Sequence, residues 1–351
     1  MPSPEASTIP TARTAARRAG IVALVCLVVV SVAFAVDSQL GALSEVRARP
    51  RPLWLIPATL ALFFFAASHA EVWRWMIRGM GFRVAPWRAR ALFNASALAR
   101  YVPTGIATFV VRIELAHREG VPRAVTATAL VYEIGLSLAA ALLLGCWFIA
   151  DLPQLRGEHL RFVVLPVAVA VIALLHPRFF VPISDRLLRR LGREPLAVTM
   201  SFARVMIATC AYTAGFLLAG LGLYAVAGSL AGVQADDLPT AIGAYSIGFA
   251  AGFAGAALPG GLGAREGATA IALTSMLSAP LAVAAAVVTR LLQLAIELSY
   301  SGVSALIARR SPSLASDDDD ALARVPGKEQ PAESNLQGGG RAEERQLKGP
   351  R

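Results

Sequence analysis

The chain has 351 residues, of which 56% are apolar, and its mean hydropathy is +0.59. Recurring apolar runs of about 18 residues or more exclude an ordinary soluble protein and indicate a polytopic membrane protein. The formal net charge of +10 comes mostly from arginines between these runs. Such arginines are typical of cytoplasmic loops, so the positive charge does not indicate a nucleic-acid partner.

The first apolar run covers residues 19–36 and follows a polar segment, residues 1–18. It is either a transmembrane helix or a signal peptide, because Ala33-Phe34-Ala35 has the small-x-small pattern of a cleavage site. The many runs that follow favour an uncleaved helix, and the arginines before it place the N-terminus in the cytoplasm. A second span is expected at residues 52–70, with an arginine-rich cytoplasmic loop after it.

Residues 91–111 form the first irregular region, because Pro103 and Gly105 interrupt its apolar pattern. Proline removes a backbone donor and clashes with the preceding turn, and glycine adds flexibility. Both flanks of the region carry arginines. A simple crossing would place one basic loop outside, whereas a re-entrant hairpin keeps both inside, so the pattern favours the hairpin over the crossing.

Three further spans are expected at residues 124–150, 160–175 and 205–227, and the arginine-rich segment 176–204 is expected to be a cytoplasmic loop. The loop after the third span contains Asp236 and Asp237 without basic residues, as expected outside the cytoplasm.

A last span is expected at residues 281–308, ending at a cytoplasmic pair of arginines. Residues 240–279 therefore have to fold back on themselves, which gives a second hairpin that enters from the opposite side. The expected fold is an all-α polytopic membrane protein with about six full spans and two broken re-entrant hairpins, about eight apolar segments in all. Residues 19–310 form its transmembrane domain, and the polar residues 311–351 are expected to be a disordered cytoplasmic tail.

The two irregular regions correspond, since each contains Pro-x-Gly followed by an arginine and a glutamate. Pro103, Gly105, Arg112 and Glu114 match Pro259, Gly261, Arg265 and Glu266. Matched breaks in two halves are typical of inverted-repeat transporters with a site near the membrane midplane. The spacing from glycine to arginine differs between the two regions, so they match in their kinds of residue but do not form a detectable sequence repeat. A ladder of small residues, Ala244, Gly248, Gly252 and Ala256, predicts close helix packing before the second break.

Ionisable residues also lie inside the flanking spans. Glu133 stands nine residues into its span, about 13 Å along a helix axis. In the last span Arg290, Gln293, Glu297, Ser301 and Ser304 share one helical face. These charges either form buried ion pairs that fix helix packing or line a polar cavity, and their clustering with two helix breaks favours the cavity.

An arginine fork is well suited to a phosphate, and exposed backbone N–H groups near a glycine-rich turn would add donors. The hypothesis for the site has three parts. The predicted head-group-binding residues are Arg112, Arg265, Arg290, Gly260, Gly261 and Gly263. The predicted charge-balancing or proton-coupling residues are Glu114, Glu133, Glu266 and Glu297, and the hairpin breaks are Pro103, Gly105 and Pro259. The sequence indicates no catalytic residue, metal site or cofactor, since no nucleophile–base pair, metal spacing or phosphate-binding lysine motif is present.

The segment Leu258-Pro-Gly-Gly-Leu-Gly-Ala-Arg-Glu-Gly267 resembles the Pro-Gly-Gly-x-Gly-x-Arg-Glu signature of the lysylphosphatidylglycerol synthase transmembrane (flippase-like) domain family. Arg100-Tyr-Val-Pro-Thr-Gly105, with Arg112 and Glu133, resembles the family's earlier motif, although Thr104 stands where a second glycine is typical. The resemblance covers about residues 20–310. It implies a bacterial inner-membrane protein that handles or flips lipids. It does not carry over synthase activity, because no aminoacyl-transfer domain is expected after Arg310.

The leading functional hypothesis is therefore a non-enzymatic protein that binds and translocates a lipid with an anionic head group, either a phospholipid or a polyprenyl-phosphate-linked lipid. The alternative is a membrane subunit that presents a lipid-linked substrate to a separate glycosyltransferase. The expected partners are membrane lipids, together with a glycosyltransferase or lipid-modifying enzyme. Both termini are expected in the cytoplasm.

Overall fold

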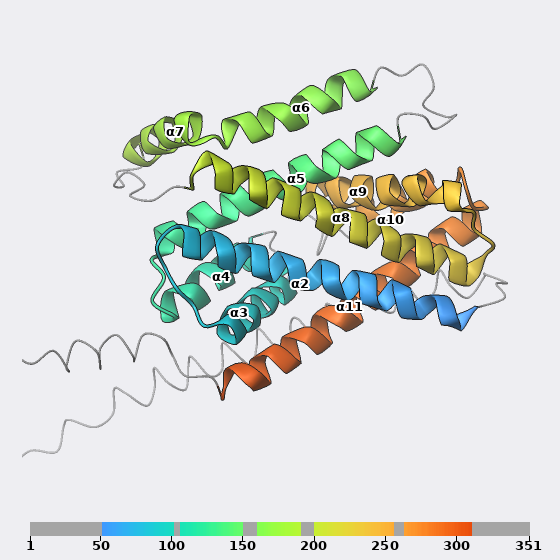
Figure 1. Ribbon diagram of the computed structural model, residues 1–351, viewed down its shortest axis with the longest axis horizontal. Helices are drawn as coiled ribbons and strands as arrows, with labels where there is room; N and C mark the ends of the chain where they lie inside the picture. Colours follow the sequence, from blue (N-terminus) through green and yellow to red (C-terminus); the bar gives the residue numbers. More distant parts are fainter. Residues whose placement is uncertain (1–50, 102–105, 150–159, 191–199, 256–262, 311–351) are drawn as a thin grey trace, which may run out of the picture. The chain divides into compact units, whose positions relative to one another are not determined.

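The computed structural model describes residues 51–101, 106–149, 160–190, 200–255 and 263–310 (Figure 1). Within these ranges the chain is almost entirely helical and contains no strand. The segments predicted as the cytoplasmic N-terminus, the first span and the C-terminal tail lie outside the described residues, as do Pro103, Gly105, Pro259, Gly260 and Gly261.

Four of the described helices are long and apolar enough to cross a membrane: α2 (Leu55–Gly79), α5 (Arg123–Ile149), α8 (Phe202–Leu230) and α11 (Ala279–Ala308). They overlap the spans expected at residues 52–70, 124–150, 205–227 and 281–308, although α2 continues past residue 70 to Gly79. The prediction of an all-α polytopic membrane protein is therefore confirmed.

Helices α2 and α8 pack against each other in opposite directions. At one end the backbone N–H of Arg51 donates to the carbonyl of Ser229 at 2.7 Å, and at the other end Arg204 donates to the carbonyl of Gly79. The contact is close because glycines of α8 face bulky residues of α2. A Cβ at Gly222 would lie 2.8 Å from the Cγ of Leu62, which is fully buried.

Helix α6 (Leu160–Leu174) covers the segment expected as a span at residues 160–175, but in its described part it is shorter than the four helices of spanning length. Helix α7 (Pro177–Arg190) follows it directly. The prediction of a loop across residues 176–204 is wrong for the part that forms α7. Apolar residues recur there at helical spacing, as at Phe179, Phe180 and Ile183, and proline is favourable at the first helical position. The arginines between them concealed this amphipathic pattern.

Two pairs of shorter helices complete the described fold. In the first, α3 (Pro86–Leu98), extended by the 3₁₀ turn η2 (Ala99–Tyr101), packs against α4 (Ala107–Arg118). In the second, α9 (Leu238–Ala254) packs against α10 (Ala264–Leu273). The first pair follows the end of α2 and the second follows the end of α8. Because α2 and α8 are antiparallel, the two pairs start from opposite ends of the bundle (Figure 1).

Gly248 and Gly252 of the small-residue ladder pack closely against α10, as predicted, whereas Ala256 lies outside the described residues. A Cβ at Gly248 would overlap the Oγ1 atom of Thr269, and a Cβ at Gly252 would lie 3.0 Å from the Cβ of Arg265. Only glycine allows the two backbones to approach this closely. The ladder thereby fixes the position of Arg265 on α10.

Candidate functional site: a charged cavity between the two helix pairs

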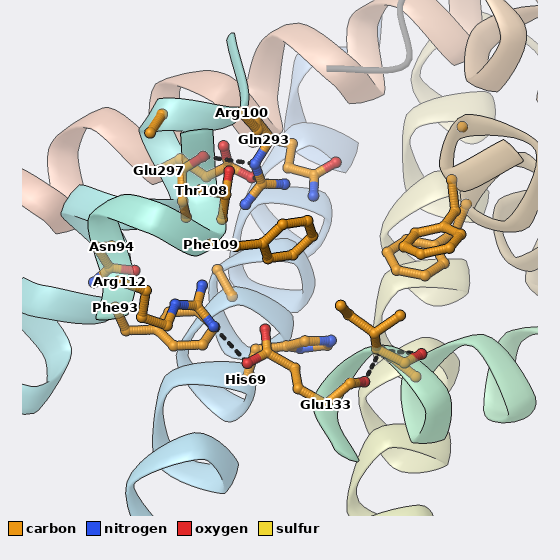
Figure 2. A pocket seen from close by; sticks show the side chains of 18 of the residues that line it. His69, Phe93, Asn94, Arg100, Thr108, Phe109, Arg112, Glu133, Gln293 and Glu297 are labelled. Carbon is orange, nitrogen blue, oxygen red and sulfur yellow. Dashed lines mark hydrogen bonds and ion pairs between the residues drawn. The ribbon is translucent and has the colours of Figure 1, made fainter. Parts of the chain in front are cut away.

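A cavity of about 240 Å³ lies between the two helix pairs and is also lined by α2, α5 and α11 (Figure 2). Phenylalanine side chains form much of its apolar wall, among them Phe65, Phe93 and Phe249. The ionisable residues in its lining are His69, Arg100, Arg112, Glu133, Arg265 and Glu297. The cavity therefore combines an apolar wall with buried charge, as ligand pockets do.

Arg112 of α4 is fully engaged by the protein. It is 2% exposed and forms an ion pair with Glu133 of α5 (Figure 2). Its Nε donates to the Oγ of Ser96 at 2.8 Å, and its guanidinium carbon lies 4.0 Å from the centre of the Phe93 ring. A buried charge is tolerated when a counter-charge and hydrogen bonds satisfy it, so this pair ties α3, α4 and α5 together.

Glu297 of α11 is held by the end of the first helix pair. The Nη1 atom of Arg100 lies 3.5 Å from its Oε1 atom, and the hydroxyl of Tyr101 donates to Oε2 at 3.4 Å. Arg100 also donates from Nε to the carbonyl of Ala97 at 2.7 Å. This second charge pair lies across the cavity from Arg112 and Glu133 (Figure 2).

Arg265 of α10 has a different environment from the other arginines. Its Nη2 donates to the amide oxygen of Gln293 at 3.1 Å, and its guanidinium carbon lies 4.9 Å from the centre of the Tyr245 ring. Among the residues that the structure describes, it forms no ion pair with a carboxylate. Arg265 therefore presents to the cavity a positive charge that an amide and aromatic rings hold but do not neutralise.

Arg290 and Glu266, together with Arg265, line a second cavity of about 10 Å³. The Nε atom of Arg290 lies 3.5 Å from the Oε1 atom of Glu266, and both side chains are largely buried. The other carboxylate oxygen of Glu266 accepts the backbone N–H of Gly263 at 2.8 Å, at the start of α10. Gly263 has φ of +84°, which favours glycine. Arg265 and Gln293 line both cavities and so separate them.

Six of the predicted site residues thus come together, namely Arg112, Arg265, Arg290, Glu133, Glu266 and Glu297. Arg100 joins them, so four arginines face three glutamates across the two cavities. With every arginine and glutamate ionised, the cluster therefore has a net charge of +1. An excess of buried positive charge is favourable for an anionic ligand and unfavourable for a cationic one.

Glu114 is not part of this cluster. Its side chain is 44% exposed and pairs with Arg118 and Arg123, each at 3.2 Å. The hydrogen bonds from Arg123 and Arg118 lower the pKa of the Glu114 carboxyl. The structure therefore places this glutamate on the outer side of α4, away from the residues that it was predicted to balance.

His69 and Arg100 line the cavity although the sequence did not identify them as site residues. His69 lies at the end of the span expected at residues 52–70, whereas in the structure α2 continues past it to Gly79. Its Nδ1 donates to the carbonyl of Phe65 at 3.0 Å, which leaves Nε2 as the acceptor. Nε2 is buried without a hydrogen-bond partner among the described residues.

The described residues contain no group of three or more histidines, cysteines, aspartates or glutamates that could hold a metal ion. The chemistry that the arrangement supports is the binding of an anion by arginine in an apolar enclosure.

The sequence profile described as "Lysylphosphatidylglycerol synthase TM region" matches residues 19–298 of the chain. The match includes both helix pairs and every charged residue of the two cavities. No curated protein matches the chain.

Proposed function

Because the chain belongs to the lysylphosphatidylglycerol synthase TM region family, we propose that it binds a lipid with an anionic head group and moves this head group across the membrane. The lipid is a phospholipid or a polyprenyl-phosphate-linked lipid. The head group enters the large cavity, while its acyl or prenyl chains stay in the bilayer. The proposal assigns no catalytic step to this chain.

The observation that carries the proposal is the neutral partner of Arg265. Arg112 is engaged by Glu133, and Arg100 is paired with Glu297. Within the described residues, the partners of the Arg265 guanidinium are neutral: the Gln293 amide, the Tyr245 side chain and the Phe249 ring. A planar guanidinium in this position can donate two parallel hydrogen bonds to a phosphate.

The other charged residues have supporting roles in the proposal. Arg290 and Arg112 add positive potential, whereas Glu133, Glu266 and Glu297 hold the arginines in place and limit that potential. The apolar walls strengthen these interactions, because charges attract more strongly at low dielectric than in water. The N–H of Gly263 is donated to the carboxylate of Glu266, and Gly260 and Gly261, which were predicted to bind the head group, lie outside the described residues.

We also propose that both short helix pairs are re-entrant and that the N- and C-termini are cytoplasmic, in a bacterial inner membrane. Each pair follows one long helix and precedes another without reaching spanning length itself. Arginines gather where α2 ends, α8 begins and α11 ends, as at Arg78, Arg204 and Arg310. The opposite end carries Asp236 and Asp237, although Arg51 also lies there. This asymmetry supports the orientation.

The test reconstitutes the full chain in vesicles that contain phosphatidylglycerol labelled on an acyl chain with the fluorophore NBD. Dithionite bleaches only the outer leaflet, so faster loss of the protected signal reports translocation. We expect wild type to accelerate this loss and Arg265→Ala to abolish most of the acceleration. The matched control is Arg118→Ala, which removes an exposed arginine paired with Glu114.

Translocation by Arg265→Ala at the wild-type rate, in protein that elutes and unfolds normally, would refute the site. A wild-type chain that binds the lipid without moving it would instead favour presentation of a lipid-linked substrate to a separate glycosyltransferase or lipid-modifying enzyme.

A further inference from the structure

Helix α7 presents an exposed face that combines apolar and basic side chains. Phe179 and Ile183 are 52% and 50% exposed. Residues 179, 183, 186 and 190 follow helical spacing, so these two side chains lie on the same face as Arg186 and Arg190. Arg178 and Arg189 are also exposed, and Asp185 is the only acidic residue in the helix.

The other side of α7 is anchored to the bundle. Phe180 is buried, and the centre of its ring lies 4.8 Å from that of Tyr132 on α5. Just before the helix, the His176 ring lies 4.6 Å from the ring of Phe202 at the start of α8. These contacts fix the helix and direct its basic, apolar face away from the bundle. None of the α7 residues lines the large cavity.

The position of α7 along the bundle determines what this face meets. The start of α8 is joined to the end of α2 by the hydrogen bond from Arg204 to Gly79. Both helices are long enough to span the membrane, so this end of the bundle lies near a membrane surface. An amphipathic helix with arginines beside large apolar side chains is typical of a segment lying in the interface.

We propose that this face of α7 binds anionic phospholipid head groups in the leaflet on its side of the membrane. Phe179 and Ile183 would enter the upper acyl region, and the arginines would contact phosphates. A lipid surface fits better than a protein partner, because four exposed arginines would need several buried acidic partners in a protein interface, whereas an anionic leaflet supplies phosphates everywhere. The proposal is independent of the cavity.

The test places a bimane fluorophore at this face, as Ile183→Cys in a full chain whose three native cysteines are replaced by alanine. The protein is reconstituted in vesicles that contain brominated phosphatidylglycerol or brominated phosphatidylcholine at equal mole fraction. Bromine quenches only on contact. We expect stronger quenching by the phosphatidylglycerol and a preference that falls in high salt, because salt screens charges near the surface.

Adding Arg186→Gln and Arg190→Gln should reduce the preference roughly tenfold, since each arginine near an anionic surface contributes measurably to binding. The variant Arg186→Lys with Arg190→Lys should keep most of it and shows that the helix remains folded. The matched control, Arg309→Gln with Arg310→Gln, neutralises an exposed pair at the end of α11 and should keep all of it.

Three results would overturn the proposal. Quenching by aqueous iodide but by neither brominated lipid would place the face in water. Equal quenching by both lipids would remove the anionic preference. Protection from lipid and iodide alike in native membranes, but not in vesicles, would show that a protein covers the face.

Discussion

The Nη2 atom of Arg265 on α10 lies 3.1 Å from the Oε1 atom of Gln293 on α11, so a neutral amide is its hydrogen-bonding partner. The Gln293 oxygen also accepts from the hydroxyl of Tyr245 at 3.4 Å. These hydrogen bonds fix the orientation of the Arg265 guanidinium but do not neutralise its charge. This arrangement differs from that of Arg112, whose charge is satisfied within the protein by Glu133.

Gln293→Glu should weaken anion binding at the site, because it places a negative charge beside Arg265. The new carboxylate would pair with Arg265, and we expect the purified protein to retain roughly tenfold less phosphatidylglycerol, with an apparent melting temperature no lower than wild type. Lipidomics of the purified protein measures the retention. The control Gln234→Glu adds the same charge at an exposed position. Unchanged retention in Gln293→Glu would show that Arg265 does not hold the lipid.

Glu133→Gln should destabilise the protein, because it leaves the Arg112 guanidinium buried beside a neutral group. Breaking a buried ion pair by removing one partner costs about 3–5 kcal/mol. Denaturation of the detergent-solubilised protein, followed by circular dichroism, measures the loss. Glu114→Gln, on the exposed side of α4, should unfold like wild type. The double change Arg112→Met with Glu133→Leu should recover much of the stability, and failure to recover would indicate a role beyond this pair.

The long helices could be predicted because their apolar runs are long enough to cross a bilayer. The end of α2 could not be predicted, because the hydropathy of the sequence falls at Glu71, before the helix ends at Gly79. In the structure Glu71 accepts from Arg74 at 2.9 Å and from Arg90 at 2.5 Å, so the helix continues through residues that are charged but paired. His69, two residues before Glu71, therefore lies inside α2 and not at its end.

The charged residues of the site were largely predictable, because an ionisable group inside an apolar span requires a partner. The prediction did not succeed for Glu114, which follows Arg112 by two positions. Two positions correspond to about 200° around a helix, so the two side chains face opposite sides. The match of Arg112 and Glu114 with Arg265 and Glu266 therefore holds for residue type but not for the position of the side chains. The pairing of each glutamate with its own arginine depends on tertiary packing that the sequence does not reveal.

Gly248→Ala should separate α9 from α10, since its Cβ would overlap the Oγ1 of Thr269. Overpacking of this kind costs about 1–3 kcal/mol, and it should also lower lipid retention because α10 carries Arg265. Gly267→Ala is the matched control, because nothing lies within 4 Å of its added Cβ and alanine is the better helix former. Adding Thr269→Ala to Gly248→Ala should restore part of the stability. Equal melting temperatures for the two single variants would contradict the close packing.

Gly263→Ala should distort the start of α10 and thereby displace Arg265 and Arg290. Gly263 has φ of +84° and donates its N–H to Glu266, which in turn lies 3.5 Å from Arg290. A residue with a side chain is strained in this conformation by about 1–3 kcal/mol, so the turn would shift and move Arg265 from its position beside Gln293. We expect a lower melting temperature together with weaker phosphatidylglycerol retention. Gly302→Ala, in the exposed face of α11 with no atom within 4 Å of its Cβ, should change neither. A Gly263→Ala protein that melts earlier but retains the lipid as wild type does would show that Arg265 keeps its position independently of the turn, and that the Glu266 cap serves stability alone.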